Sequence, residues 1–206
     1  MSNLELILSV LRLEGLPYTL LAERNGALRF SLLVVFLSGL SQSLGQSVVL
    51  FANEVKPHRF VSSLLVAAFI YVFGFLFLSA SIWLVASYVF DKDRALIDII
   101  QTVGLSYAPY LFSFFILAPY FGSFISTTLS LWSLAALLIA LQVTLGLSLS
   151  SALMCSALGW VLLQILQRTV GRPVGRTAQF LRRLAAGKGL ELNPEELRKM
   201  LRQRKK

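Results

Sequence analysis

The sequence predicts an all-α fold: a polytopic integral membrane helical bundle with about five transmembrane helices, an N-terminal amphipathic helix and a basic C-terminal helical tail. The first observation behind this prediction is a run of 69 residues, Ile99 to Gln167, without Asp, Glu, Lys, Arg or His. Because the hydrocarbon core of a bilayer takes about 20 apolar residues per helix, this run is long enough for three crossings. The second is that 56% of the residues are hydrophobic and only 14% charged, which is outside the usual balance of a soluble protein.

The third observation is the distribution of positive charge. Twelve of the nineteen basic residues lie from Arg168 onward, directly after the last apolar segment, as is typical of the cytoplasmic side of a membrane protein. The net charge of +9 therefore indicates a membrane flank, and we expect no nucleic-acid partner. The chain divides into an N-terminal amphipathic or interfacial segment (1–24), a five-span domain (25–167) and a basic tail (168–206).

The N-terminal segment has the periodicity of an amphipathic helix of about three turns, ended by Gly15 and Pro17. Two surfaces would suit its apolar stripe, the membrane interface or the protein's own bundle, and the sequence leaves both open. The stripe consists of Leu4, Ile7, Leu8 and Leu11, opposite Glu5, Ser9 and Arg12.

The first predicted span covers about residues 28–51 and carries a ladder of small and polar side chains. Small side chains let two helices approach closely, and glutamine amides can form hydrogen bonds across the contact. The ladder therefore predicts a helix-packing face, with a polar substrate path as the alternative. Its members are Gly39, Ser43 and Ser47, flanked by Gln42 and Gln46.

A polar loop at 53–59, with Pro57 as a helix breaker, separates the first span from the second. The second span covers residues 60–90, and its 31 uncharged residues exceed the thickness of a bilayer, so we expect it to tilt or to extend beyond one interface. The charged loop Asp91 to Arg94 ends it sharply.

Three further spans are expected in the charge-free run. A short interfacial segment (95–103) precedes a third span (105–122), which has Pro109 near its start, where proline is tolerated. The fourth span covers about 124–143. The fifth covers about 151–167, and small residues recur on one face of it, which again predicts close packing: Ala152, Cys155, Ser156 and Gly159.

An odd number of spans places the two termini on opposite sides of the membrane. If the C-terminus is cytoplasmic, fourteen basic residues lie inside and five outside, in agreement with the positive-inside rule. We therefore expect a multi-pass protein of a bacterial-type inner or internal membrane with its C-terminus in the cytoplasm.

The basic tail has two interpretations. Its arginines could contact anionic lipid headgroups or an acidic partner, or the tail could be solvated and only fix the topology. The residues proposed for lipid or partner contact are Arg168, Arg172, Arg176, Arg182 and Arg183.

Catalytic and metal-binding motifs are missing from the sequence. There is no GxxxxGK[ST], HExxH, CxxC or GxSxG motif, and no predicted span carries in its interior a charged residue of the kind that marks a proton relay. We therefore expect a protein that is not an enzyme and that binds neither a cofactor nor a metal.

Several short motifs resemble those of the Yip1 family of membrane proteins, over residues 25–167. They are the segment Gln101 to Pro109 with Gly104, Ser106 and Tyr107, then Trp132, then Leu145-Gly146-Leu147-Ser148 with Ala152, and the opening Gly26 to Arg29 is similar to that of bacterial members. The resemblance implies a five-span α-helical domain. Eukaryotic relatives act as membrane scaffolds with small GTPases and vesicle-trafficking partners, but the GTPase-binding role is not assigned to residues of this chain.

These observations favour a non-enzymatic membrane scaffold that organises the membrane, trafficking or partner assembly through a protein partner or a second copy of itself. The alternative is a small transporter or channel subunit, in which Pro109 would break a helix within the membrane. Its polar path would be lined by Gln42, Gln46, Ser106, Tyr107, Tyr110 and Gln142.

Overall fold

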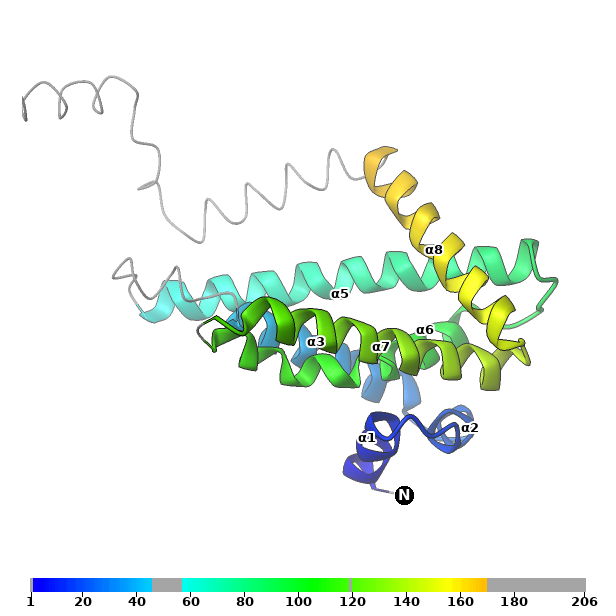
Figure 1. The fold of residues 1–206 in the computed structure, drawn as a ribbon, viewed down its shortest axis with the longest axis horizontal. Helices are drawn as coiled ribbons and strands as arrows, with labels where there is room; N and C mark the ends of the chain where they lie inside the picture. Colours follow the sequence, from blue (N-terminus) through cyan, green and yellow to red (C-terminus); the bar gives the residue numbers. More distant parts are fainter. Residues whose placement is uncertain (1, 46–56, 119, 170–206) are drawn as a thin grey trace, which may run out of the picture.

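The computed structural model describes residues 2–45, 57–118 and 120–169. This part of the chain is entirely helical, without a strand, as predicted. Two short helices precede a set of longer ones (Figure 1). The elements are α1 (Asn3–Leu11), α2 (Leu16–Ala22), α3 (Ala27–Gly45), α5 (Pro57–Tyr88), α6 (Leu96–Leu105), the 3₁₀ helix η1 (Ala108–Leu117), α7 (Gly122–Leu145) and α8 (Leu149–Thr169).

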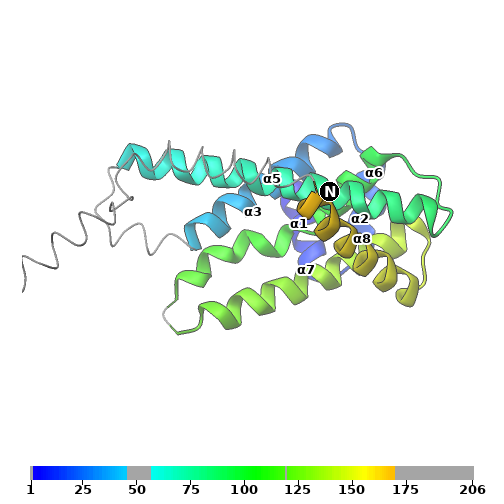
Figure 2. The same ribbon diagram turned by 90° about the horizontal axis from the view of Figure 1, so that it is seen from above.

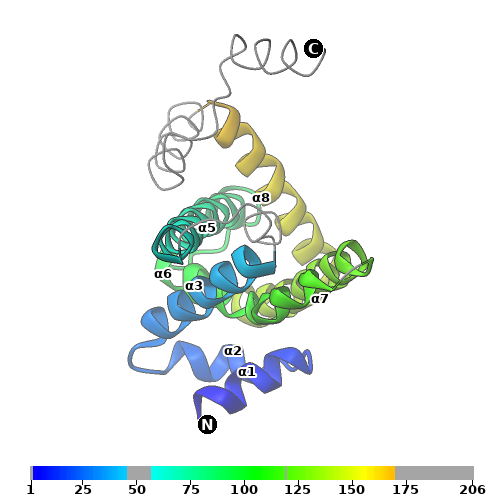
Figure 3. The same cartoon turned by 90° about the vertical axis from the view of Figure 1, so that its left-hand side faces the viewer.

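The long helices alternate in direction and lie side by side (Figure 2). The end of α3, the start of α5 and the turn between η1 and α7 lie at one end of the bundle, which we call the Tyr120 end. The start of α3, the α5–α6 loop and the α7–α8 turn lie at the opposite end, which we call the Arg94 end. α8 crosses α5 obliquely, and α1 and α2 lie across the other side of the bundle (Figure 3).

Within the described residues, three helices are long and apolar enough to cross a membrane: α3, α5 from Phe60, and α7. The count becomes four if α6 and η1, which meet at an angle of 41°, are taken as one broken span. This is fewer than the five spans predicted. The fifth predicted span corresponds to α8, whose described apolar part, Leu149–Ile165, is shorter than the other three.

Two predicted boundaries differ from the structure. Pro57 begins α5 instead of breaking the chain before it, in agreement with the tolerance of proline in a first helical turn. The predicted interfacial segment (95–103) corresponds to α6, and the predicted third span (105–122) begins with η1, a 3₁₀ helix that a break separates from α6. Pro109, at the second position of η1, has no amide hydrogen for the Leu105 carbonyl, and its ring would clash with that carbonyl in a continuous α-helix.

The larger hydrophobic core lies where α5, α6, α7 and α8 meet. Phe75, Ile82, Ile99, Leu141 and Cys155 are buried in it. The contact between α8 and α5 is so close that a Cβ atom on the glycine at 159 would lie 2.7 Å from the Cγ1 atom of Ile82, and this glycine belongs to the small-residue face predicted for the fifth span.

A second core lies under α1 and α2. The inward face of α1, with Leu6 and Val10, is buried together with Tyr18 and Leu21 of α2 against α3, α7 and the α6–η1 break. α1 begins with a capping box, in which the Ser2 side chain accepts from the Glu5 amide and the Glu5 carboxylate accepts from the Ser2 amide. The face of α1 that packs on the bundle is not the predicted stripe. Leu6, Ser9 and Val10 are buried, although Ser9 was predicted on the polar side, whereas Leu4 and Leu8 of the predicted stripe are exposed.

Candidate functional site

The break between α6 and η1 is the most unusual backbone feature of the bundle. A 3₁₀ segment of ten residues is long, because 3₁₀ runs beyond three or four residues are uncommon and a mid-helix stretch often marks strain or a hinge. Hydroxyl groups from the neighbouring helices bind the backbone on both sides of this break.

Three serines on one face of α3 donate hydrogen bonds to backbone carbonyl oxygens of the broken element. Each of these bonds joins residues about seventy positions apart, so they fix α3 against α6 and η1. We call Ser31, Ser38 and Ser41 the serine clamp. The pairs are Ser31 with Gln101 (2.9 Å), Ser38 with Tyr107 (3.1 Å) and Ser41 with Leu111 (2.8 Å).

Ser41 makes two bonds at once. Its hydroxyl donates to the Leu111 carbonyl at 2.8 Å and accepts from the Phe114 amide at 2.9 Å. These are the two backbone groups that an i to i+3 bond of a 3₁₀ helix would join. The hydroxyl therefore bridges them from outside and stabilises η1 through a neighbouring helix.

α7 binds the break from another side. The Ser133 hydroxyl donates to the Ser106 carbonyl at 3.0 Å, and Thr102 and Thr144 share a hydrogen bond of 3.1 Å between α6 and α7. Since Ser106 lies between the two arms, its carbonyl is one that a continuous helix would have bonded internally. α7 supplies the missing donor.

Two glycines allow the backbones to approach. A Cβ atom at Gly104 would lie 2.9 Å from the Cβ of Ser31 and 3.3 Å from the ring of Phe75. A Cβ atom at Gly45 would clash with the carbonyl oxygen of Ser113. The serine bonds therefore depend on glycine at these positions.

An aromatic cluster lies beside the break. Tyr107 makes edge-to-face contacts with Tyr71 of α5 at 5.8 Å and with Phe75 of α5 at 5.4 Å between ring centroids. Tyr110 of η1 lies 5.5 Å from Tyr107. Such pairs add about 0.5–1.5 kcal/mol beyond the burial of their area, so the cluster ties α5 to the break.

A few polar atoms near these helices have no hydrogen-bond partner within the described residues. They are buried and comprise Gln42 Oε1, Ser79 Oγ, Ser113 Oγ and Arg24 Nη1. An unpaired buried amide oxygen is costly, so among the residues predicted to line a polar path Gln42 gives that path support.

The predicted site residues are placed as follows. Gly39 lies against α5, since a Cβ there would be 3.0 Å from the Cβ of Tyr71, and Ser43 donates to the Gly39 carbonyl of its own helix. Tyr107 and Pro109 lie at the break, and Gln142 is partly buried on α7. Arg168 belongs to the last turn of α8. Gln46, Ser47, Arg172, Arg176, Arg182 and Arg183 lie outside the described residues.

The serine clamp itself was not predicted. Its residues and Gly45 share one face of α3, next to the face on which the predicted ladder of Gly39 and Ser43 begins. The spacing of Ser31 and Ser38, two helical turns apart, is the sequence signal that could have found it.

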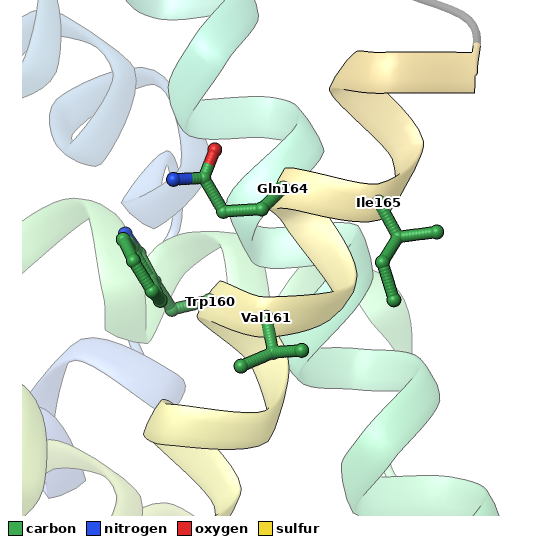
Figure 4. Close-up of a pocket in the computed structure, with 4 residues that line it drawn as sticks. All are labelled: Trp160, Val161, Gln164 and Ile165. Atoms are coloured by element: carbon green, nitrogen blue, oxygen red, sulfur yellow. The ribbon is translucent and has the colours of Figure 1, made fainter.

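α8 bears a hollow of about 280 Å³ on its outer surface (Figure 4). Trp160 and Gln164 point to one side of the helix there, and Val161 and Ile165 to the other. Its described lining comes from α8 alone, and the side chains of Trp160 and Val161 are exposed.

Metal-binding geometry is not found in the described part of the chain, where no three His, Cys, Asp or Glu residues group together. Comparisons with protein-family models, with curated proteins and with solved structures found no match to this chain.

Proposed function

We propose that this chain is a non-enzymatic, multi-pass membrane scaffold of the Yip1 type that organises the membrane or assembles partner proteins. In this proposal α6 and η1 form one broken span and α8 is a short, tilted fifth span. The basic tail then lies on the side opposite the N-terminus, in the cytoplasm, where it can contact anionic lipid headgroups.

The use of the buried hydroxyl groups supports this proposal. Ser31, Ser38, Ser41 and Ser133 all donate to backbone carbonyls of the broken element, so these polar side chains join helices. A conducting path needs polar groups directed into a water-filled space, whereas a scaffold needs a rigid bundle with a lipid- or partner-facing exterior.

The exterior of the bundle offers broad contact surfaces. Phe69 and Phe73 of α5, Phe124 of α7 and Leu153 of α8 are 51–69% exposed. Such side chains face lipid or another membrane protein. A crosslinker placed at one of them will react reproducibly with a second polypeptide only if a partner protein lies against that position.

Photo-crosslinking in native membranes tests the scaffold proposal. A photoreactive amino acid replaces Phe69, Phe73, Phe124 or Leu153 in separate variants, and Phe75, which is 1% exposed, serves as the inward control. The proposal predicts one reproducible polypeptide adduct, identified by mass spectrometry, from positions on a single side of the bundle. Adducts with lipid alone at all exposed positions, together with no effect of deleting residues after Arg172, would contradict it.

A small transporter or channel subunit is the second candidate, favoured by the unpaired oxygen of Gln42. The substitution Gln42→Leu separates the two. A scaffold tolerates it, because an apolar residue of similar volume removes an unpaired polar atom. A transporter using this amide would lose flux of its substrate while retaining its fold and its partner adducts.

A further inference from the structure

The two N-terminal helices carry apolar side chains on two faces. The inner face is buried against the bundle, with Leu6 at 1% and Tyr18 at 3% exposure. Five leucines of these helices and of the turn between them are exposed, and we call them together the leucine ridge: Leu4 (72% exposed), Leu8 (52%), Leu13 (38%), Leu16 (56%) and Leu20 (36%). Several exposed leucines on short, non-spanning helices indicate an interaction surface.

Charged side chains border the leucine ridge. Glu5, Arg12, Glu14 and Glu23 are exposed on the same two helices or at their ends. Residues 1–24 contain three acidic and two basic side chains, a net charge of −1. This charge gives no attraction to anionic headgroups, so a lipid contact here must come from insertion of the leucines.

The N-terminal helices are fixed to α7 by two hydrogen bonds of long sequence separation. The Tyr18 phenol donates to the Ala136 carbonyl at 3.1 Å, and the Trp132 indole donates to the Leu11 carbonyl at 3.0 Å. A Cβ atom at Gly15 would lie 3.1 Å from the side chain of Val143, so the connection between the two helices also contacts α7. The N-terminal helices are therefore held against the part of α7 between Trp132 and Val143, on a helix that is long and apolar enough to cross a membrane.

The position of these contacts along α7 follows from the helical rise. Trp132 lies ten residues after Gly122, the start of α7, and Val143 lies two before Leu145, its end. At about 1.5 Å per residue these separations are about 15 Å and about 3 Å, so α1 and α2 lie along the half of α7 that is nearer the Arg94 end.

The charges decide which lipid region this surface meets. Each charged residue at the centre of a bilayer costs about 2.5–3.5 kcal/mol on insertion scales, so the four exposed charges cannot lie in hydrocarbon. Exposure of five leucines to bulk water would also be unfavourable. The boundary between headgroups and acyl chains accommodates both, since amphipathic helices insert there by about 5–10 Å.

We propose that α1 and α2 form a lipid-binding wedge, fixed to α7, whose leucine ridge inserts at the headgroup–acyl boundary of one leaflet. The hydrocarbon layer then extends from the wedge to the Tyr120 end, and the Arg94 end lies in the headgroup region. This inference rests on the proposal that the chain spans a membrane.

Spin-label accessibility in phosphatidylcholine vesicles tests the wedge with the full chain. The chain has one cysteine, Cys155, so the Cys155→Ala variant accepts a single label at Leu8→Cys, Glu5→Cys or Phe69→Cys. We expect the Leu8 label to collide more with oxygen than with a water-soluble nickel complex, at a shallower depth than the Phe69 label on α5. The Glu5 label should collide more with the nickel complex.

Each other outcome has a distinct meaning. A Leu8 label as nickel-accessible as the Glu5 label would place the ridge in water, and a Leu8 label accessible to neither reagent would show that protein, such as a second copy, covers it. Both results overturn the wedge while leaving the membrane proposal intact. A nickel-accessible Phe69 label would instead overturn the membrane proposal. Leu16→Cys repeats the test on α2, and Cys155→Ser replaces the alanine background if that variant folds poorly.

Discussion

Replacing Gly104 by alanine has two opposing effects on stability, a gain in helix propensity and a loss of close packing between α6 and α3. Alanine gains about 0.5–1 kcal/mol in helix propensity. At Gly104, however, the new methyl group would lie 2.9 Å from the Cβ of Ser31 and 3.4 Å from its backbone carbonyl carbon, neither of which is the flexible end of a side chain. α3 must then move away from α6, and overpacking of this kind costs about 1–3 kcal/mol.

Gly74 of α5 is the matched control, because a Cβ atom there would meet no atom within 4 Å. Reversible unfolding in mixed micelles, followed by circular dichroism, compares the two variants under the same conditions. We expect Gly74→Ala to be neutral or stabilising and Gly104→Ala to destabilise by about 1–2 kcal/mol after the propensity gain is subtracted. Equal effects of the two substitutions would refute the close contact between α3 and α6.

Three further substitutions or conditions test separate parts of the structure. Ser41→Ala should cost about 1–3 kcal/mol of unfolding free energy, since it removes two hydrogen bonds between α3 and η1. Ser130→Ala removes only a bond within α7 itself and should change the unfolding free energy by less than about 0.5 kcal/mol. Gly146→Ala should cost about 1 kcal/mol in the same assay, because φ is +62° at this C-cap of α7, a conformation that alanine adopts with strain even though a Cβ atom would meet no neighbour. An unchanged unfolding free energy would argue against the left-handed cap. Burial raises the pKa of the Tyr18 phenol above its ordinary value of 10.0. The contribution of the buried neutral phenol to stability should therefore be constant below pH 10 and decline above it. Limited proteolysis of the N-terminal helices should show this decline in the wild type and a smaller decline in Tyr18→Phe.

Composition and apolar length predicted the helical elements well. The second predicted span, 60–90, corresponds to α5 (Pro57–Tyr88), and the fourth, 124–143, to α7 (Gly122–Leu145). Such boundaries are local properties, because a helix in lipid must satisfy its backbone within itself and ends where charge, proline or glycine appears.

The serine clamp depends on tertiary contacts that local patterns do not encode. Ser41 and Ser43 are two positions apart in α3, yet Ser41 bonds to η1 and Ser43 to its own helix. Either role is available to any serine in a helix, and the neighbouring carbonyl decides between them. For the same reason Pro109 indicated a helix start but could not show how η1 is oriented relative to the preceding α6.

The docking of α1 and α2 on α7 is a further tertiary feature. A leucine stripe suits a membrane interface and a protein surface equally well, so periodicity left the two open. The bonds from Tyr18 to Ala136 and from Trp132 to Leu11 span more than a hundred residues, and they select the protein surface for one face of the helices.

The central claim is that α6 and η1 together cross the membrane once, since the five-span topology and the opposite placement of the termini depend on it. Asp93, in the α5–α6 loop, and Tyr120, in the η1–α7 turn, are both exposed at opposite ends of the bundle. The most direct measurement is labelling of Asp93→Cys and Tyr120→Cys, in the Cys155→Ala background, with a membrane-impermeant maleimide in sealed vesicles. One broken span predicts that only one of the two sites reacts before the vesicles are opened and that the other reacts afterwards. Reaction of both from the same side would show a re-entrant element and contradict the claim.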